Sequence, residues 1–138
     1  IIAHKLKRYP LVAVLHHASG GARGRGLTLA QLAAQPFVLR EEGSVTRQLL
    51  LDEMGRRGLR LGPLIEIEGR EAVCEAVAQG LGVAVMSSAE VMADKRIAAV
   101  AIRDWNGFME EFMLTLKARG NLHLIRAFTA AALTADKP

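Results

Sequence analysis

The sequence predicts an α/β protein in which helices cover a mostly parallel sheet. The chain has 138 residues, 51% of them hydrophobic, which suffices for one domain with a buried core. Only 4% of the residues are aromatic, and a chain rich in Ala, Leu, Val and Gly favours helices packed on a sheet. Short apolar runs alternate with segments of helical period along the chain, which is the order expected of such proteins.

The first part of the chain contains two expected strands and one helix. The apolar run at 11–15 predicts a buried strand, and a glycine-rich connection at 20–26 follows it. Thr28 is suited to begin a helix that continues to residue 34. The apolar run at 36–39 predicts a second strand directly after this helix.

The middle of the chain continues the alternation. Leucines at helical spacing predict a helix at 44–57, and the run at 64–68 predicts a strand. A second amphipathic helix is expected at 71–79, and Gly80 is suited to end it. The apolar run at 83–86 then predicts a buried strand.

The last part of the chain predicts a short helix at 88–93, strands at 97–102 and 112–116, and a closing amphipathic helix at 122–133. In a mostly parallel sheet, ligands bind at the carboxyl ends of the strands, beside helix N-termini. The loops that follow the strands are therefore the places where a binding site is expected.

Composition excludes several classes of protein. Cys74 is the single cysteine, so no intrachain disulfide can form, and a cytoplasmic setting is expected. Neither a secretory signal nor an apolar stretch of roughly 20 residues is present, so no membrane association is expected. The net charge is +4, but the basic residues are dispersed without interleaved aromatic residues, which favours a solvated basic surface over a nucleic-acid site.

No catalytic, metal or cofactor site is expected either. His16 and His17 are adjacent, so in a strand their side chains would point to opposite faces. The loop at 21–28 has the glycine spacing of a phosphate loop, but Leu27 stands where such a loop needs a lysine. Cys74 lies on an apolar helix face without a histidine nearby in sequence, so an inert thiol is expected and the chain is not expected to be an enzyme.

Two helix starts are candidate anion sites. In the segment 39–47 a strand ends, a glycine turns the chain, and Ser44 and Thr46 begin a helix whose free N–H groups suit an anion. A second helix start follows at 66–71, where Arg70 could pair with a carboxylate, phosphate or phosphonate. Each start also has a purely structural interpretation: Ser44 as an N-cap of its own helix, and Arg70 as a solvated side chain.

Four stretches resemble the effector-binding domain of LysR-type transcription regulators. They are Leu-x-x-Leu-Ala-x-x-Pro-Phe-Val at 29–38, Arg-Glu-x-Gly-Ser-x-Thr-Arg at 40–47, Glu-Ile-Glu-Gly-Arg-Glu-Ala-Val at 66–73, and Ala-Val-Ala-Gln-Gly-Leu-Gly-Val-Ala-Val-Met-Ser at 76–87. The order and spacing of these motifs match the family, and the resemblance extends from about residue 9 to residue 128. Gly69-Arg70 departs from the Ser-Asn of many members.

The resemblance implies a fold like the type 2 periplasmic binding proteins, with one near-complete lobe and the C-terminal part of the other. Residues 1–14 would end the first lobe and cross over, 15–95 would form the second lobe, and 96–138 would return to the first. The rest of the first lobe and a DNA-binding winged helix-turn-helix would lie outside this sequence. The alternative is one lobe of an extracytoplasmic solute-binding protein of related fold.

The resemblance also implies a function and a set of contacts. A small, anionic effector would bind between the lobes of a homo-oligomeric regulator, and DNA would be bound only through the absent N-terminal domain. The form of residues 66–73 is similar to a subgroup associated with aminoethylphosphonate catabolism, which implies a phosphonate or carboxylate effector. The expected effector contacts are Arg40, Glu42, Gly43, Ser44, Thr46, Gly69, Arg70, Glu71 and Ser87.

Overall fold

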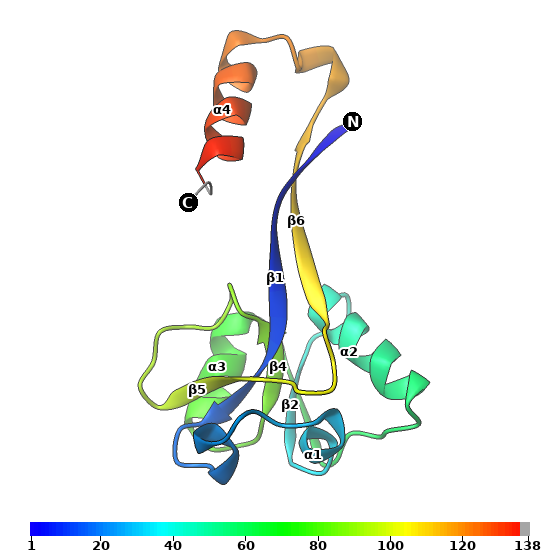
Figure 1. The fold of residues 1–138 in the computed structure, drawn as a ribbon, viewed down its shortest axis with the longest axis vertical. Coiled ribbons are helices and arrows are strands. Elements are labelled where there is room, and N and C mark those ends of the chain that lie inside the picture. The colour runs from blue at the N-terminus through cyan, green and yellow to red at the C-terminus, as the bar shows by residue number, and fades with distance from the viewer. Residues whose placement is uncertain (136–138) are drawn as a thin grey trace. The chain divides into compact units, whose positions relative to one another are not determined.

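The computed structural model describes residues 1–135 and divides the chain into two compact units. The larger unit is Pro10–Met109, and the smaller one combines Ile1–Tyr9 with the chain from Glu110 onward. The boundaries expected after residues 14 and 95 both fall inside the larger unit. The elements (Figure 1) are β1 (Ile2–His16), η1 (Gly20–Arg23), α1 (Leu29–Ala33), β2 (Phe37–Arg40), α2 (Val45–Arg56), β3 (Leu64–Ile67), α3 (Arg70–Ala78), β4 (Ala84–Ser87), β5 (Ile97–Ala101), β6 (Phe108–Thr115), η2 (Lys117–Arg119) and α4 (His123–Thr134).

The sheet of the larger unit has one strand that runs against the others. β1 pairs in antiparallel register with β4 on one side and β5 on the other. β2 and β3 are parallel, and a parallel bridge between Phe37 and Val83 connects β2 with the start of β4. Parallel pairing is thus present between β2 and β3 and at the bridge to Val83, whereas β4 and β5 both pair with the antiparallel β1, so the sheet is mixed and not mostly parallel as expected. Apolar content alone does not encode the direction of a strand.

Local sequence signals explain where the helices of this unit begin. The Thr28 hydroxyl accepts from the Gln31 backbone, and the Gln31 side chain accepts from the Thr28 backbone, so α1 has a complete capping box. The Ser44 hydroxyl caps α2 by accepting from Arg47 N. After α3, Gly80 has a φ of 76°, as expected for a glycine that ends a helix.

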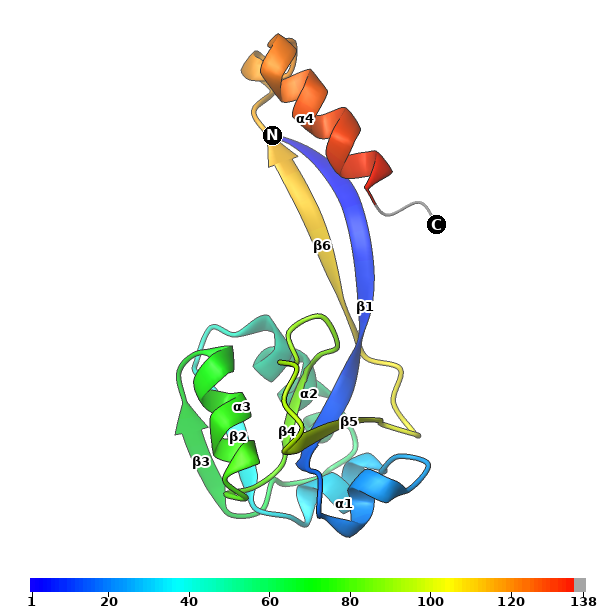
Figure 2. The same cartoon turned by 90° about the vertical axis from the view of Figure 1, so that its left-hand side faces the viewer.

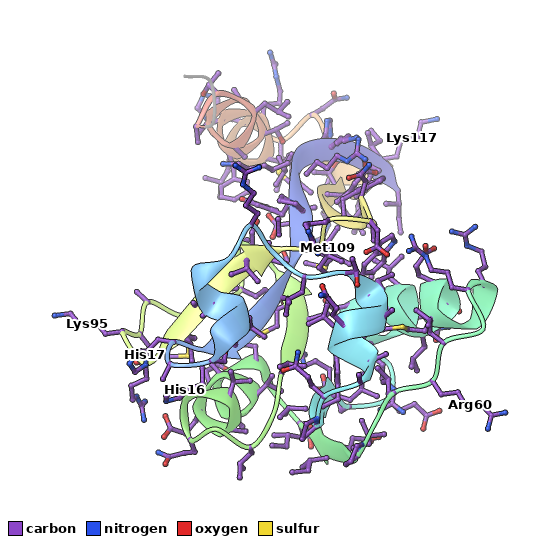
Figure 3. The ribbon with its side chains drawn as sticks, turned by 60° about the horizontal axis from the view of Figure 1, so that its bottom comes forward. His16, His17, Arg60, Lys95, Met109 and Lys117 are labelled. Atoms are coloured by element: carbon purple, nitrogen blue, oxygen red, sulfur yellow. The ribbon has the colours of Figure 1, made fainter. Side chains whose placement is uncertain are left out.

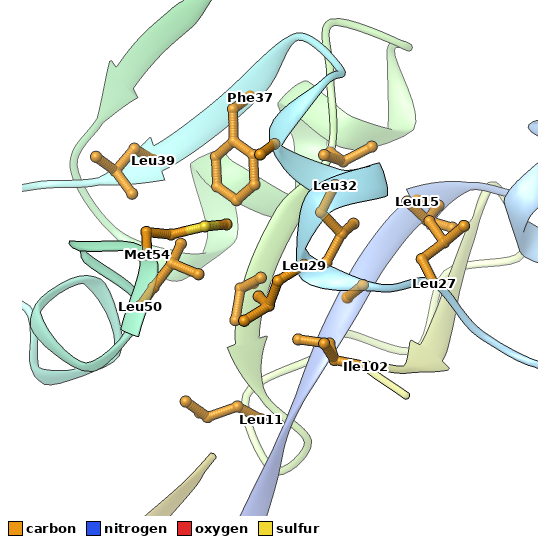
Figure 4. Close-up of a cluster of buried hydrophobic side chains, with 14 residues drawn as sticks. Leu11, Leu15, Leu27, Leu29, Leu32, Phe37, Leu39, Leu50, Met54 and Ile102 are labelled. Atoms are coloured by element: carbon orange, nitrogen blue, oxygen red, sulfur yellow. The ribbon is translucent and has the colours of Figure 1, made fainter. Parts of the chain in front are cut away.

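Both faces of the sheet are covered, as the alternation along β2 shows. Phe37 and Leu39 belong to a buried cluster with α1 and α2, which contribute Leu29 and Leu50 (Figure 4). Val38, between them, belongs to a second buried cluster with residues of α3. Figure 2 shows α3 beside β2. Successive side chains of a strand point to opposite faces, so a continuous apolar run is what a doubly covered strand requires.

Three expected elements differ in the structure. The segment 88–93 forms a turn at 88–90 and no helix, because Glu90 N donates to Ser87 O and the Ser87 hydroxyl accepts from Ala89 N. β1 begins at Ile2 and β6 at Phe108, so both are longer than the runs 11–15 and 112–116 predicted. Polar residues in these extensions conceal the strands from an apolar pattern.

The smaller unit exposes much of its apolar surface. Residues of β1 and β6 pair, and Lys5 forms an ion pair with Glu110. No residue of α4 is buried among the residues that the structure describes. Large apolar side chains of this unit that are at least one third exposed are Ile1, Ile2, Phe112, Leu114, Leu116, Leu122, Leu124, Phe128 and Leu133. Such a surface normally packs against further protein.

Candidate functional site

The carboxyl ends of β2, β3 and β4 lie at one edge of the sheet in the larger unit. These strands end at Arg40, Ile67 and Ser87, and they run in the same direction. β1 enters the larger unit at this edge, since Leu11 is the partner of Ser87 and Ser88 N donates to Pro10 O at 2.9 Å. Every effector contact expected from the sequence lies at the last residue of one of these strands, in the loop that follows it, or in the first turn of the next helix.

At the start of α2, side chains satisfy their own helix. Gly43 has a φ of 91°, and Ser44 accepts from Arg47 N at 3.4 Å, so the N-cap interpretation of Ser44 is present in the structure. Thr46 is only 3% exposed, and its hydroxyl donates to the Met109 sulfur at 4.0 Å. Glu42 is exposed in the loop. The hydroxyl groups of Ser44 and Thr46 therefore form hydrogen bonds within the protein, while Glu42 is exposed to solvent.

At the start of α3, the expected ligand arginine pairs with its neighbour. Gly69 is the N-cap residue with a φ of 86° and a ψ of 140°. Arg70 Nε donates to Glu71 Oε1 at 2.9 Å, and both side chains are more than half exposed. This hydrogen bond raises the pKa of Arg70 and lowers that of Glu71. An exposed pair of this kind is weak, so Arg70 can exchange partners easily.

The residue that sequence reasoning missed at this edge is Glu41. Arg40 donates to the Glu41 carboxylate through Nε at 2.8 Å and through Nη2 at 2.7 Å. Gly69 N, at the start of α3, also donates to Glu41 Oε2, at 3.2 Å. The hydrogen bonds from Arg40, with that from Gly69, hold the pKa of Glu41 at about 2. Glu41 thus links the two expected anion sites, which lie 28 residues apart in sequence.

Ser87 and Glu90 complete the edge. Ser87 is fully buried, and its hydroxyl accepts from Ala89 N at 3.4 Å in the turn after β4. This turn places Glu90 Oε2 at 4.0 Å from Arg40 Nη1. Among the described residues, Glu90 Oε2 is buried and has no hydrogen-bond partner. The helix expected at 88–93 did not predict that Glu90 lies near Arg40.

Five charged groups form what we call the edge cluster: Arg40, Glu41, Arg70, Glu71 and Glu90. Besides Glu41, both Glu90 and Glu71 raise the pKa of Arg40, so these charges lie within interaction range of one another. With two arginines and three glutamates, the edge cluster carries one net negative charge. The Arg40 side chain is 15% exposed and is neutralised by carboxylates of the chain itself.

Other chemistry has little support in the part of the chain that the structure describes. No group of three or more His, Cys, Asp or Glu side chains there is suited to hold a metal ion. His16 ends β1, and its ring lies 4.7 Å from that of His17 (Figure 3); the expectation of opposite faces was wrong because the strand stops at His16. Cys74 is buried, and its thiol donates to the Met86 sulfur at 3.7 Å.

Two further features of the described residues lie apart from this edge. None of the helices described at residues 1–135 has the length and apolar character needed to cross a bilayer. The smaller unit contains an open hollow of about 830 Å³ between residues of β1 and α4, including His4, Arg126 and Thr129. This hollow does not include any of the effector contacts expected from the sequence.

Comparison with known proteins gives one family. Residues 1–137 match the LysR substrate binding domain. The RuBisCO operon transcriptional regulator of Allochromatium vinosum is 34% identical over 99 residues, which are 72% of this chain and 33% of that protein. The corresponding regulator of Acidithiobacillus ferrooxidans is 32% identical over 108 residues, 78% of this chain and 35% of that protein. The chain spans about a third of the length of these relatives.

Solved structures share the fold at low sequence identity. The regulatory domain of CcmR from Synechocystis PCC6803, in complex with 2-PG, has a TM-score of 0.86 at 18% identity and covers 99% of this chain and 67% of that one. The effector binding domain of QuiR, in complex with shikimate, has a TM-score of 0.78 at 17% identity and covers 95% of this chain and 64% of that one. The expected α/β fold, like that of the type 2 periplasmic binding proteins, is confirmed.

Proposed function

Because the chain belongs to the LysR substrate-binding domain family, we propose that it is the effector-sensing part of a bacterial LysR-type transcription regulator. The observation that carries this proposal is the edge of the larger unit, where a largely buried arginine, Arg40, and the backbone N–H of Gly69 at the start of α3 both donate to the Glu41 carboxylate. A guanidinium beside a helix N-terminus is a combination that binds oxyanions. The effector would thus be a small molecule with an acidic group.

The effector contacts proposed from the sequence fall into two roles. The effector would touch the exposed residues Glu42, Gly43, Arg70 and Glu71 directly. It would also accept from the Gly69 amide and the largely buried Arg40 guanidinium. Ser44, Thr46 and Ser87 are engaged by the protein and would shape the floor of the site by fixing the loops. The relatives solved with 2-PG and with shikimate support a small-molecule effector of this kind.

In the intact protein, binding would shift a conformational equilibrium without making or breaking a covalent bond. An effector that favours one arrangement of the sensing domain changes the output by its difference in affinity between arrangements. DNA would be bound by a winged helix-turn-helix elsewhere in a longer, homo-oligomeric protein that works in the cytoplasm. The relatives named above are transcriptional regulators, which favours this output over a solute-binding lobe.

Calorimetric titration of the intact protein tests the proposal. The probes are 2-aminoethylphosphonate, inorganic phosphate and benzoate. We expect saturable binding of at least one of them, weakened about tenfold by Arg70→Ala because one charge-assisted contact is lost. The matched control is Arg60→Ala, since Arg60 is exposed before the amino end of β3, away from the carboxyl edge. Equal weakening by both variants would show that general charge, and not the edge, attracts the ligand.

A further inference from the structure

The Glu41 carboxylate occupies the place where an anionic effector would be expected to bind. It accepts two hydrogen bonds from Arg40, at 2.8 and 2.7 Å, and a third from Gly69 N at 3.2 Å. These are the groups that an oxyanion would use: a planar pair of donors on a guanidinium and a backbone N–H at a helix start, which has no acceptor within its own helix. The side chain of Glu41 is 29% exposed, so it lies at the border between the site and solvent.

The remaining face of Arg40 is also engaged by the chain. Glu90 Oε2 lies 4.0 Å from Arg40 Nη1, close enough for electrostatic attraction. Arg40 is thus approached by one carboxylate in a bidentate hydrogen bond and by another at longer range. The pKa of Glu41 is lowered to about 2, first of all by its hydrogen bonds with Arg40, so this carboxylate is charged at neutral pH.

We propose that Glu41 is a specificity-determining residue that competes with anionic effectors for Arg40 and for the amide of Gly69. This inference rests on the proposed function, because it concerns the same edge. An incoming anion has to displace the Glu41 side chain, which swings away toward solvent and leaves its donors to the ligand. As a tethered competitor, Glu41 is present at high effective concentration, so only anions that satisfy the same three donors displace it.

The competition has a consequence for ligand choice. A ligand with two or more oxygens on one acidic group can accept from Arg40 Nε and Nη2 and from Gly69 N as Glu41 does. Carboxylates, phosphates and phosphonates have this geometry. A ligand with a single acceptor atom leaves donors unsatisfied when Glu41 moves, and this loss disfavours it.

The test compares Glu41→Gln with Glu68→Gln in the intact protein. Glutamine keeps the size of residue 41 and an acceptor for Gly69 N, but it removes the charge that holds Arg40. Glu68 is exposed and precedes Gly69 in the loop between β3 and α3. Glu68→Gln therefore removes an equal charge without freeing Arg40. Titration with inorganic phosphate and with acetate should give affinities at least about tenfold higher for Glu41→Gln, and within about twofold of the wild type for Glu68→Gln.

A second variant and a second signal keep the test decisive. Glu90→Gln should raise the phosphate affinity by a smaller factor, because Glu90 is at 4.0 Å from Arg40 and forms no hydrogen bond with it. The NMR signal of the Gly69 amide should shift when phosphate is added, since the amide exchanges one acceptor for another. A gain in affinity is an effect that a merely damaged loop would not produce.

The outcomes separate this inference from the proposed function. If phosphate binds the wild type and Glu41→Gln with equal affinity, or binds the variant more weakly, Glu41 is no competitor and the inference is overturned while the anion site stands. If equal gains follow Glu41→Gln and Glu68→Gln, the effect is general electrostatics and the inference is again overturned. If neither phosphate nor acetate binds the wild type or any variant, the anionic effector fails, and this inference fails with it.

Discussion

Gly69→Ala should destabilise the protein through its backbone alone. Gly69 has a φ of 86° and a ψ of 140°, outside the helical regions that residues with a Cβ populate at positive φ. A Cβ added there would meet Glu71 Oε2 at 3.9 Å, an ordinary contact, so crowding contributes little. The cost is therefore conformational, about 1 to 3 kcal/mol for a residue held in such a region.

Gly55→Ala is the matched control. Gly55 lies within α2, where an added Cβ would meet nothing within 4 Å, and alanine is favoured over glycine in helices by about 0.5 to 1 kcal/mol. Urea denaturation of the intact protein, followed by far-UV circular dichroism, should separate the two variants by about 1.5 to 4 kcal/mol. Stabilities within about 0.5 kcal/mol of each other would refute the argument that Gly69 is required for its backbone conformation.

Three further changes probe the core, a helix cap and an ion pair. Leu29→Ala removes a fully buried side chain and should cost about 3 kcal/mol in urea denaturation; a cost below about 1 kcal/mol would contradict the packing described. Ser44→Ala removes the N-cap acceptor of α2 and should cost about 1 kcal/mol, whereas Ser44→Asp should retain most of the stability. Hydrogen bonds from Arg56 and then Arg57 lower the pKa of Glu53, so Glu53 stabilises the fold above the ordinary glutamate pKa and loses this effect as pH falls through the lowered value. Thermal unfolding should accordingly show Glu53→Gln less stable than the wild type at neutral pH, with a difference that shrinks in acid; a constant difference would count against the ion pair.

Local chemistry explains which elements the sequence could predict. Thr28 and Ser44 are N-caps in the structure because their hydroxyl groups accept from backbone N–H groups within three residues. The apolar run at Phe37 is a strand covered on both faces, as an unbroken apolar run indicates. The turn after Ser87 was not predicted, because it depends on hydrogen bonds that the Ser87 hydroxyl and carbonyl accept from Ala89 N and Glu90 N. Such local bonds compete with a helix, and helical propensity does not take them into account.

Apart from the helix expected at 88–93, the sequence by itself determined the order of strands and α-helices, the capped helix starts and the family, since all of these depend on neighbouring residues and their spacing. Only the tertiary structure decided the direction of β1, which depends on pairings with β4 and β5 far away in the chain. It also decided which of two adjacent glutamates contributes to the edge cluster. Glu41 accepts hydrogen bonds from Arg40 and from the amide of Gly69, whereas Glu42 is exposed to solvent. Sequence cannot rank them, because a hydrogen bond between residues 28 positions apart exists only once the parallel strands have brought both loops to the same edge.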